Sequence, residues 1–316
     1  MISHLTFLGL FIWVLGGDVD VLIKAHDGKF YIDQVADPFL LSEASVADWG
    51  NVSYFGLRIG FPLLGWPLHF LLGRFGALVA VGAVAASIGS VWAARLAVDA
   101  GKNAWWGLTL AVNPASAFAA GLLLADTIAY AAVVGSLLAA SRRRWVAATL
   151  LALLAVATKE ASLAPLGMAA AYYWIRGEKK AAWTVLVPLA WHISWAVNLT
   201  SRYDPLHSGE FVGWPFVGVV QAARRVWLVS NQVDPAIFAA AGMFILAAVA
   251  VVLLVRRPGA LIAAAAGAGL IYPFMDWQVL YPISNLPRIG GWLFPLLALA
   301  GANPTTASSV VRPLRD

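Results

Sequence analysis

Long apolar runs separated by short polar stretches dominate the chain, and a bilayer crossing needs about 20 apolar residues. Residues 1–17 are apolar but lack a basic start and a small-residue cleavage site, which favours an uncleaved first span over a signal peptide. Nine further candidate spans follow, at about residues 76–95, 104–113, 126–141, 145–158, 161–175, 183–199, 236–255, 259–275 and 289–302. The pattern predicts an all-α, polytopic integral membrane protein with about ten transmembrane helices.

Two stretches interrupt this series of spans. The polar segment from Asp18 to Trp49 holds seven of the sixteen acids, which predicts a long, structured and functional loop. The apolar segment 58–72 is interrupted by Pro62 and Pro67, so we interpret it as a helix that lies at the membrane interface.

The domain organisation follows from these segments. We expect one transmembrane helical domain over residues 1–302, which includes an outer loop with its interfacial helix at 18–75. Residues 113–126 are expected to form a broken, partly embedded connection between two spans. A short cytoplasmic tail follows at 303–316.

Composition excludes several classes of protein. The 316 residues are 61% hydrophobic and 12% charged, and the mean hydropathy is +0.79, which excludes a water-soluble globule. The absence of cysteine excludes disulfides, thiolate metal sites and cysteine nucleophiles. The sequence also lacks HExxH, Walker, GxSxG and Rossmann motifs, so metalloprotease, nucleotide-hydrolase and dinucleotide-binding interpretations have no support.

The charge distribution sets the orientation. With the loop at 18–75 outside, the cytoplasmic side receives twelve cations against three acids, a net charge of +9. The outer side receives nine cations against thirteen acids, a net charge of −4, and the two sides together give the +5 of the chain. This asymmetry satisfies the positive-inside rule, most clearly at the turns 142–144 and 256–257. The net charge therefore indicates membrane orientation and no nucleic-acid partner.

Ionisable side chains beside apolar spans cost about 3 kcal/mol on insertion scales, so each one is a candidate site residue. Asp27 precedes a glycine and lies among aromatic residues, and it is suited to act as a general base or as a ligand to a hard divalent cation. The alternative is a solvated loop acid that caps a turn. The same two interpretations apply to Asp33 and Asp37.

Four further positions lie on the same predicted face. Arg58 is suited to bind a phosphate, and the alternative is that it snorkels to ordinary headgroups. Asp126 starts a predicted span, where an acid commonly satisfies free helix N–H groups. Lys159 and Glu160 occupy a short turn, either as a local ion pair or as part of a pocket. Arg288 is a second candidate for an anionic group.

Several short motifs along the chain form a family pattern. They are His26-Asp27-Gly28-Lys29-Phe30-Tyr31, Ala36-Asp37-Pro38-Phe39, Arg58-Ile59-Gly60-Phe61-Pro62-Leu63-Leu64, Asn113-Pro114 up to Asp126, Thr158-Lys159-Glu160 and Asn285-Leu286-Pro287-Arg288. Together they resemble the GT-C superfamily of glycosyltransferases that use polyprenyl-phosphate sugars. The nearest resemblance is to compact bacterial members linked to cell-surface glycopolymer formation.

The resemblance implies a role for each matching residue. Asp27 would be the catalytic acid of the first outer loop, which deprotonates an acceptor hydroxyl or helps to hold a divalent cation such as Mg²⁺ or Mn²⁺. Glu160 would orient its lysine neighbour or bind a sugar hydroxyl. The expected donor-phosphate ligands are Arg58, Lys159 and Arg288, and the expected substrate-binding residues are His26, Tyr31, Asp37, Asp126 and Glu160.

The expected function is therefore sugar transfer from a polyprenyl-phosphate donor to a glycan or lipid acceptor of the cell envelope, on the non-cytoplasmic face of a bacterial inner membrane. Nothing on the cytosolic side of the sequence is suited to bind a nucleotide sugar. One alternative is a lipid-linked-sugar flippase or transporter. Another is a non-catalytic subunit of a glycopolymer assembly complex. The chain has no soluble carbohydrate-binding domain such as larger relatives carry, so a partner subunit is also considered.

Overall fold

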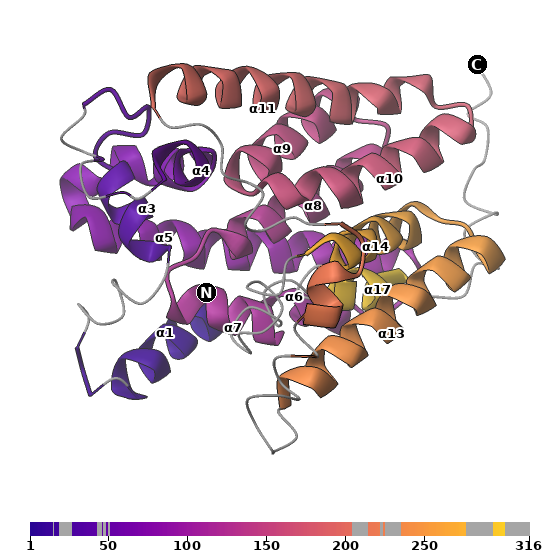
Figure 1. Ribbon diagram of the computed structural model, residues 1–316. Helices are drawn as coiled ribbons and strands as arrows, with labels where there is room; N and C mark the ends of the chain where they lie inside the picture. The colour runs from indigo at the N-terminus through magenta and orange to yellow at the C-terminus, as the bar shows by residue number, and fades with distance from the viewer. Residues whose placement is uncertain are drawn as a thin grey trace.

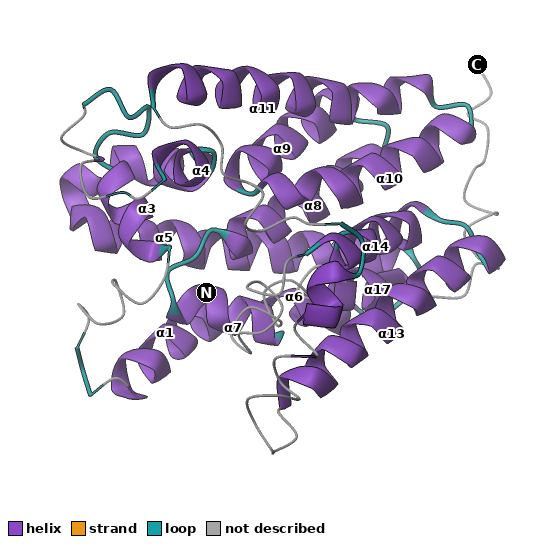
Figure 2. Cartoon of the chain, viewed as in Figure 1, coloured by secondary structure: helices purple, strands orange, loops and turns teal. Residues whose placement is uncertain are grey.

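The chain folds as a bundle of helices (Figure 1). A computed structural model describes residues 1–14, 16–18, 27–42, 46, 49, 51–203, 214–221, 224, 235–275 and 293–300. Within these ranges the regular structure is helical and contains no strand (Figure 2). The all-α prediction is confirmed for this part of the chain.

The α-helices follow one another with short connections. They are α1 (Ile2–Val14), α3 (Gly28–Gln34), α4 (Val52–Gly56), α5 (Gly60–Asp99), α6 (Leu108–Ala111), α7 (Pro114–Gly121), α8 (Asp126–Ser141), α9 (Trp145–Thr158), α10 (Leu163–Ile175), α11 (Trp183–Arg202), α13 (Pro235–Arg256), α14 (Ala260–Leu270) and α17 (Leu293–Ala300). Short 3₁₀ helices precede or follow several of them, namely η2 (Ala104–Gly107), η3 (Glu160–Ser162), η4 (Lys179–Ala182) and η6 (Tyr272–Phe274).

The predicted spans agree with the helices to different degrees. The spans predicted at 126–141 and 145–158 coincide with α8 and α9, and α11 and α13 extend slightly beyond their predicted bounds. The span predicted at 104–113 is instead divided into η2 and α6. Asn113 then caps α7, so the expected broken connection at 113–126 contains a helix of eight residues.

The longest helix, α5, contains 40 residues and bends at Gly73, where φ is +69°. Glycine adopts this left-handed conformation at no steric cost, so the bend lies there and at neither proline. Pro62 lies in the first helical turn, where backbone N–H groups need no helical partner, and Pro67 is accommodated inside the helix. The arm before Gly73 corresponds to the predicted interfacial helix.

In the described ranges, α5 is the one helix that is both long enough and apolar enough to cross a membrane. Shorter apolar helices of 10–17 residues accompany it, namely α1, α8, α9 and the segments 241–256 and 260–274.

Helix α8 forms the centre of the bundle and packs between α5 and α9. Every residue from Asp126 to Ala140 is buried. Small residues allow the close approach of its neighbours, because a Cβ at Gly89 of α5 would lie 2.8 Å from the Cβ of Ala131. The core is therefore made mainly of alanine, valine and leucine from several helices.

The bundle has two chemically different ends. We name the end at which α3 and α4 lie together the loop end, and it is at the left of Figure 1. At the opposite end, which we name the basic end, Asp99 at the terminus of α5 pairs with Arg142, with 2.9 Å between Oδ2 and Nη2. Arg143 pairs there with Glu178 at 2.6 Å. Helix α8 spans the distance between the two ends, and its 16 residues correspond to about 24 Å.

Candidate functional site

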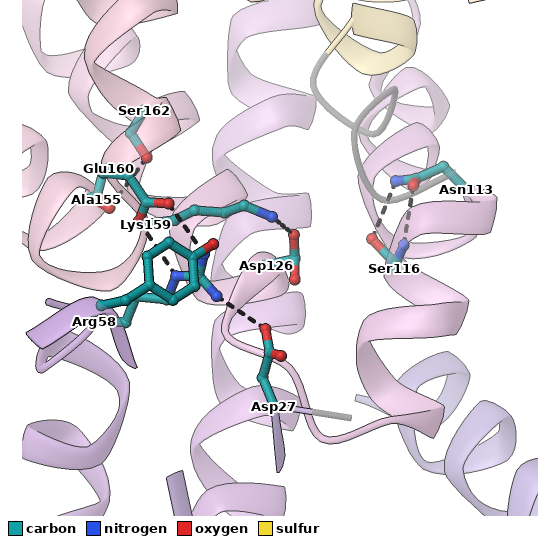
Figure 3. A network of polar contacts seen from close by, with 10 residues as sticks. Asp27, Arg58, Asn113, Ser116, Asp126, Ala155, Lys159, Glu160 and Ser162 are labelled. Carbon is teal, nitrogen blue, oxygen red and sulfur yellow. Dashed lines mark hydrogen bonds and ion pairs between the residues drawn. The ribbon is translucent and has the colours of Figure 1, made fainter. Parts of the chain in front are cut away.

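Asp27 is held in place by tight packing of the helix that follows it. It occupies the N-cap position of α3, yet its side chain makes no capping hydrogen bond. Gly28 lies so close to the segment after α7 that a Cβ there would be 3.0 Å from the carbonyl oxygen of Leu122. The Asp-Gly pair therefore fixes the start of α3 against this segment, and the carboxylate is directed to Arg58 (Figure 3).

Arg58 lies between α4 and α5, with an exposed fraction of only 7%. Its Nη1 donates to Oδ2 of Asp27 at 2.8 Å. Its Nε and Nη2 donate to the two carboxylate oxygens of Glu160, at 3.2 and 3.0 Å. Its Nη2 also donates to the Tyr54 hydroxyl at 2.7 Å, and the guanidinium lies 4.9 Å from the centre of that ring. The guanidinium is thus buried and paired with two acids.

The electrostatics of this pairing keep both partners charged. Burial on its own would raise the pKa of Glu160, but the charge and hydrogen bonds of Arg58 outweigh it and lower that pKa to about 2. Burial on its own would lower the pKa of Arg58, but Glu160 and the neighbouring groups raise it well above the ordinary value. Burial raises the pKa of Tyr54, so its hydroxyl stays protonated and able to accept from Arg58.

A second ion pair lies beside the first. Lys159 Nζ donates to Oδ1 of Asp126, whose side chain is 2% exposed. The backbone of Lys159 is extended, with φ −157° and ψ 117°. This conformation separates the two neighbouring side chains, so Lys159 pairs with Asp126 and Glu160 pairs with Arg58.

Five of the residues singled out from the sequence therefore meet at the loop end. We name them the charge cluster, and they are Asp27, Arg58, Asp126, Lys159 and Glu160 (Figure 3). Three acids and two cations alternate within it, which gives a net charge of −1 when all are ionised. These groups come from residues as far apart in the sequence as Asp27 and Glu160, and the Arg58–Glu160 pair alone spans 102 residues.

The other predicted site residues are not members of the charge cluster. Tyr31 is buried in α3 against Phe61, with 5.4 Å between the ring centres, and burial raises its pKa. The charges of Arg58 and Asp27 act on its hydroxyl, which places Tyr31 at the edge of the charge cluster. Asp37 accepts a hydrogen bond from the backbone N–H of Ser42 at 2.8 Å, which is the turn-forming role considered for it. His26 and Arg288 lie outside the described residues.

A glycine contact fixes the spacing between Arg58 and Glu160. A Cβ at Gly60 would lie 2.4 Å from the Thr158 hydroxyl oxygen and 2.9 Å from backbone atoms of the α9 terminus. Gly60 follows Arg58 by two residues, and Thr158 precedes Glu160 by two. The start of α5 therefore packs directly on the end of α9, and this packing positions the ion pair.

Tyr54 is a site residue that sequence reasoning missed. Its spacing of four residues from Arg58 was the available signal, because side chains four apart on a helical turn are neighbours. Asn51 caps α4 by accepting from the Tyr54 N–H at 2.9 Å. Phe55 of α4 stacks on Phe30 of α3, with 3.6 Å between the ring centres. These contacts hold Tyr54 beside Arg58.

His192 lies in α11, next to the loop end. Its Nδ1 is buried and has no hydrogen-bond partner among the described residues. Its neighbour Trp195 donates from Nε1 to the carbonyl oxygen of Gly56 at 2.9 Å, which attaches α11 to α4. Helix α11 therefore covers the side of the loop end on which α4 lies.

A nearby polar group satisfies its own hydrogen bonds. Asn113 accepts from the Ser116 N–H at 3.0 Å (Figure 3). It also donates to the carbonyl oxygens of Thr109 and Leu110, at 3.0 and 2.8 Å. Through the first of these bonds Asn113 caps the N-terminus of α7. Asn113 therefore has a structural role in forming the connection that leads to Asp126.

The charge cluster does not fit a divalent cation. Within the described ranges, no group of three or more histidine, aspartate or glutamate side chains is arranged to hold a metal ion. Asp27 and Glu160 face Arg58, and Asp126 faces Lys159, so a cation between them would meet two positive charges. The arrangement of these residues therefore does not fit the Mg²⁺ or Mn²⁺ that the family resemblance implies.

Comparison with known proteins returns no relative. No protein-family model matches the chain, and no curated protein or solved structure matches it either.

Proposed function

We propose that the chain is an integral membrane glycosyltransferase of the GT-C type. It transfers a sugar from a polyprenyl-phosphate donor to a glycan or lipid acceptor, on the non-cytoplasmic face of a bacterial inner membrane. The observation that carries this proposal is the 2.8 Å contact between Asp27 and the buried Arg58, because it joins a candidate base to a candidate phosphate ligand.

Exposed apolar surface supports the membrane location that we propose together with about ten spans. The first arm of α5 exposes Trp66, Phe70 and Leu71, with exposed fractions of 44%, 72% and 83%. Large apolar side chains are also exposed along α11 and α13, including Ile193 and Ile245. Such surface is costly in water and is compatible with lipid. The basic end would then face the cytoplasm.

The proposed reaction needs a base and a stabilised leaving group. The acceptor hydroxyl oxygen attacks the anomeric carbon of the donor sugar, and the bond from that carbon to the phosphate oxygen breaks. The electron pair of this bond leaves with the polyprenyl phosphate, and Asp27 accepts the hydroxyl proton. Cationic side chains stabilise the negative charge that develops on the phosphate.

Both cations of the charge cluster are already engaged, so a donor phosphate has to compete with a carboxylate. Arg58 holds Glu160 by two hydrogen bonds and Asp27 by one. A phosphate would therefore displace Asp27 more easily than Glu160. Donor binding at Arg58 would in this way release the Asp27 carboxylate to act as the base. Lys159 is the second phosphate ligand that we propose.

The full pairing of the charge cluster favours one competing function. Ion pairs of this kind also occur as purely structural elements, and a non-catalytic subunit of a glycopolymer assembly complex would need nothing more from them. In such a subunit, loss of one carboxylate would lower the stability of the fold and would have no effect on catalysis.

The deciding experiment is glycosyl transfer in proteoliposomes from a panel of radiolabelled polyprenyl-phosphate sugars. Asp27→Asn is compared with wild type. Asp33→Asn is the matched control, because it makes the same change six residues further on, in α3, at a carboxylate that is not part of the charge cluster. We expect transfer to be abolished by Asp27→Asn and retained by Asp33→Asn. Folding of each variant is checked by its thermal unfolding midpoint.

Two results would overturn the proposal. Equal transfer by wild type and Asp27→Asn would exclude Asp27 as the base. Absence of transfer from every donor, with labelled donor lipid crossing the bilayer equally in both forms, would exclude the transferase and support a flippase.

A further inference from the structure

A cavity of about 340 Å³ lies at the basic end of the bundle. The last turns of α5, α8, α10, α13 and α17 and the first turn of α14 surround it. Its size falls at the lower end of the range for ligand pockets, which is about 300 to 1,000 Å³. We name it the inner cavity, and the length of α8 separates it from the charge cluster.

The wall of the inner cavity is mostly apolar. Leucine side chains from several helices line it, including Leu96, Leu137 and Leu253. Its polar groups are few, and among them are Ser141 and Arg257. An apolar cavity with few polar groups gains most from an apolar ligand that carries a single charged group.

The charge around the inner cavity is positive. Asp99, the acid that lines it, is neutralised by Arg142 at 2.9 Å. Arg257 is exposed and has no ion-pair partner within the described residues. Arg256 lies next to it at the terminus of α13. The free guanidinium at the cavity is therefore available to an anion.

We propose that the inner cavity binds one anionic phospholipid of the cytoplasmic leaflet. One acyl chain fills the apolar cavity, and the lipid phosphate binds the guanidinium of Arg257. Arginine suits this role because its planar fork of donors matches two phosphate oxygens. Basic pockets between helices on the cytoplasmic side are the expected position for such lipids. This site goes beyond the proposed sugar transfer, and of the proposed function it rests only on the membrane location and orientation.

The apolar part of the site has a steric test. Ala260 lines the inner cavity at the start of α14 and is only partly buried, so a larger side chain there enters the cavity without passing through the core. Ala260→Trp would fill the space of the acyl chain. Ala104→Trp makes the same change at an exposed position of η2 that does not line the cavity, and it serves as the control.

The polar part of the site has a charge test. Arg257→Gln removes the phosphate ligand and leaves the apolar wall unchanged. Arg144→Gln is the matched control, because Arg144 is an exposed arginine of the same end that does not line the cavity. The measurement is native mass spectrometry of the full chain in detergent, with phosphatidylglycerol and phosphatidylcholine of equal chain length added together.

We expect wild type, Ala104→Trp and Arg144→Gln to retain one phosphatidylglycerol, in preference to phosphatidylcholine by about tenfold. Both lipids carry the phosphate, but the choline cation of phosphatidylcholine is repelled by the guanidinium of Arg257. Arg257→Gln is expected to lose this preference, and Ala260→Trp to lose both lipids. Equal retention of the two lipids by wild type would overturn the proposal. An equal effect of Arg144→Gln and Arg257→Gln would also overturn it, because it would indicate attraction to the basic surface as a whole. The arginine comparison decides the outcome even if Ala260→Trp does not fold.

Discussion

Arg58 binds both carboxylate oxygens of Glu160, at 3.2 Å from Nε and 3.0 Å from Nη2, across 102 residues of sequence. This bidentate pair connects the start of α5 to the turn between α9 and α10. It also leaves Nη1 to hold Asp27. The stability of the loop end and the position of the proposed base therefore depend on the same guanidinium.

Glu160→Gln should destabilise the chain by about 1 to 3 kcal/mol, because it removes one of the two acids that compensate a buried guanidinium. Glu178→Gln is the matched control, since Glu178 pairs with an arginine whose side chain is 71% exposed. Its cost should be about 0 to 1 kcal/mol. Unfolding curves in detergent measure both values, and an equal loss in the two variants would contradict the expectation.

The pH dependence of stability should depend on Glu160. Its pKa in the folded chain is about 2, below the ordinary value of 4.5, so ionised Glu160 stabilises the folded state. This contribution is fully present above about pH 4.5 and is lost as the pH falls toward 2. Thermal unfolding midpoints at several pH values should fall less steeply in Glu160→Gln than in wild type. Parallel pH profiles would show that Glu160 contributes nothing.

Lys159 and Asp126 should show strong coupling. Lys159→Met removes the cation from a carboxylate that is 2% exposed, and we expect a cost of about 3 kcal/mol. The double variant Lys159→Met with Asp126→Asn removes the buried charge as well, so it should be more stable than Lys159→Met alone. A double-mutant cycle on unfolding free energies measures this. Simple additivity of the two changes would contradict it.

Gly60→Ala should disturb the site through packing. The added Cβ would meet backbone atoms of the α9 terminus, which cannot rotate away, so α5 has to shift together with Arg58. We expect a loss of about 1 to 3 kcal/mol in stability and a loss of transfer activity. Gly167→Ala in α10 is the control, because no atom lies within 4 Å of its Cβ position. That change should stabilise the helix by about 0.5 kcal/mol or leave it unchanged.

Arg58→Lys should test the proposed exchange of Asp27 for the donor phosphate. Lysine keeps the positive charge but cannot hold Glu160 by two parallel bonds. We expect kcat/KM for the donor to fall by about tenfold to a hundredfold, with the acceptor KM little changed. Initial rates at varied donor and acceptor concentrations separate the two effects. An equal rise in both KM values would instead indicate a general loss of structure.

Much of the fold follows from hydrophobic periodicity, which gave α8 and α9 their observed bounds. The bend in α5 at Gly73 lies between the predicted segments 58–72 and 76–95, whereas the two prolines that suggested breaks within 58–72 do not interrupt the helix. The five members of the charge cluster could be named from the sequence, since charges beside apolar spans are costly. Their partners could not, because pairing depends on contacts such as that between Gly60 and Thr158, which arise only from tertiary packing.

Helix α8 is enclosed by protein on every side from Asp126 to Ala140. A cysteine placed at any position of this stretch should therefore not react with water-soluble thiol reagents. A helix with one exposed face would instead show a reactive position every three or four residues. Even alanine is excluded at Gly135, where a Cβ would lie 2.4 Å from the Trp92 ring. A library of substitutions should accordingly find α8 uniformly intolerant, whereas exposed helices such as α11 should tolerate change on one face. The central helix should therefore be the part of this chain that adapts least, and tolerated changes should gather in the connections at its ends.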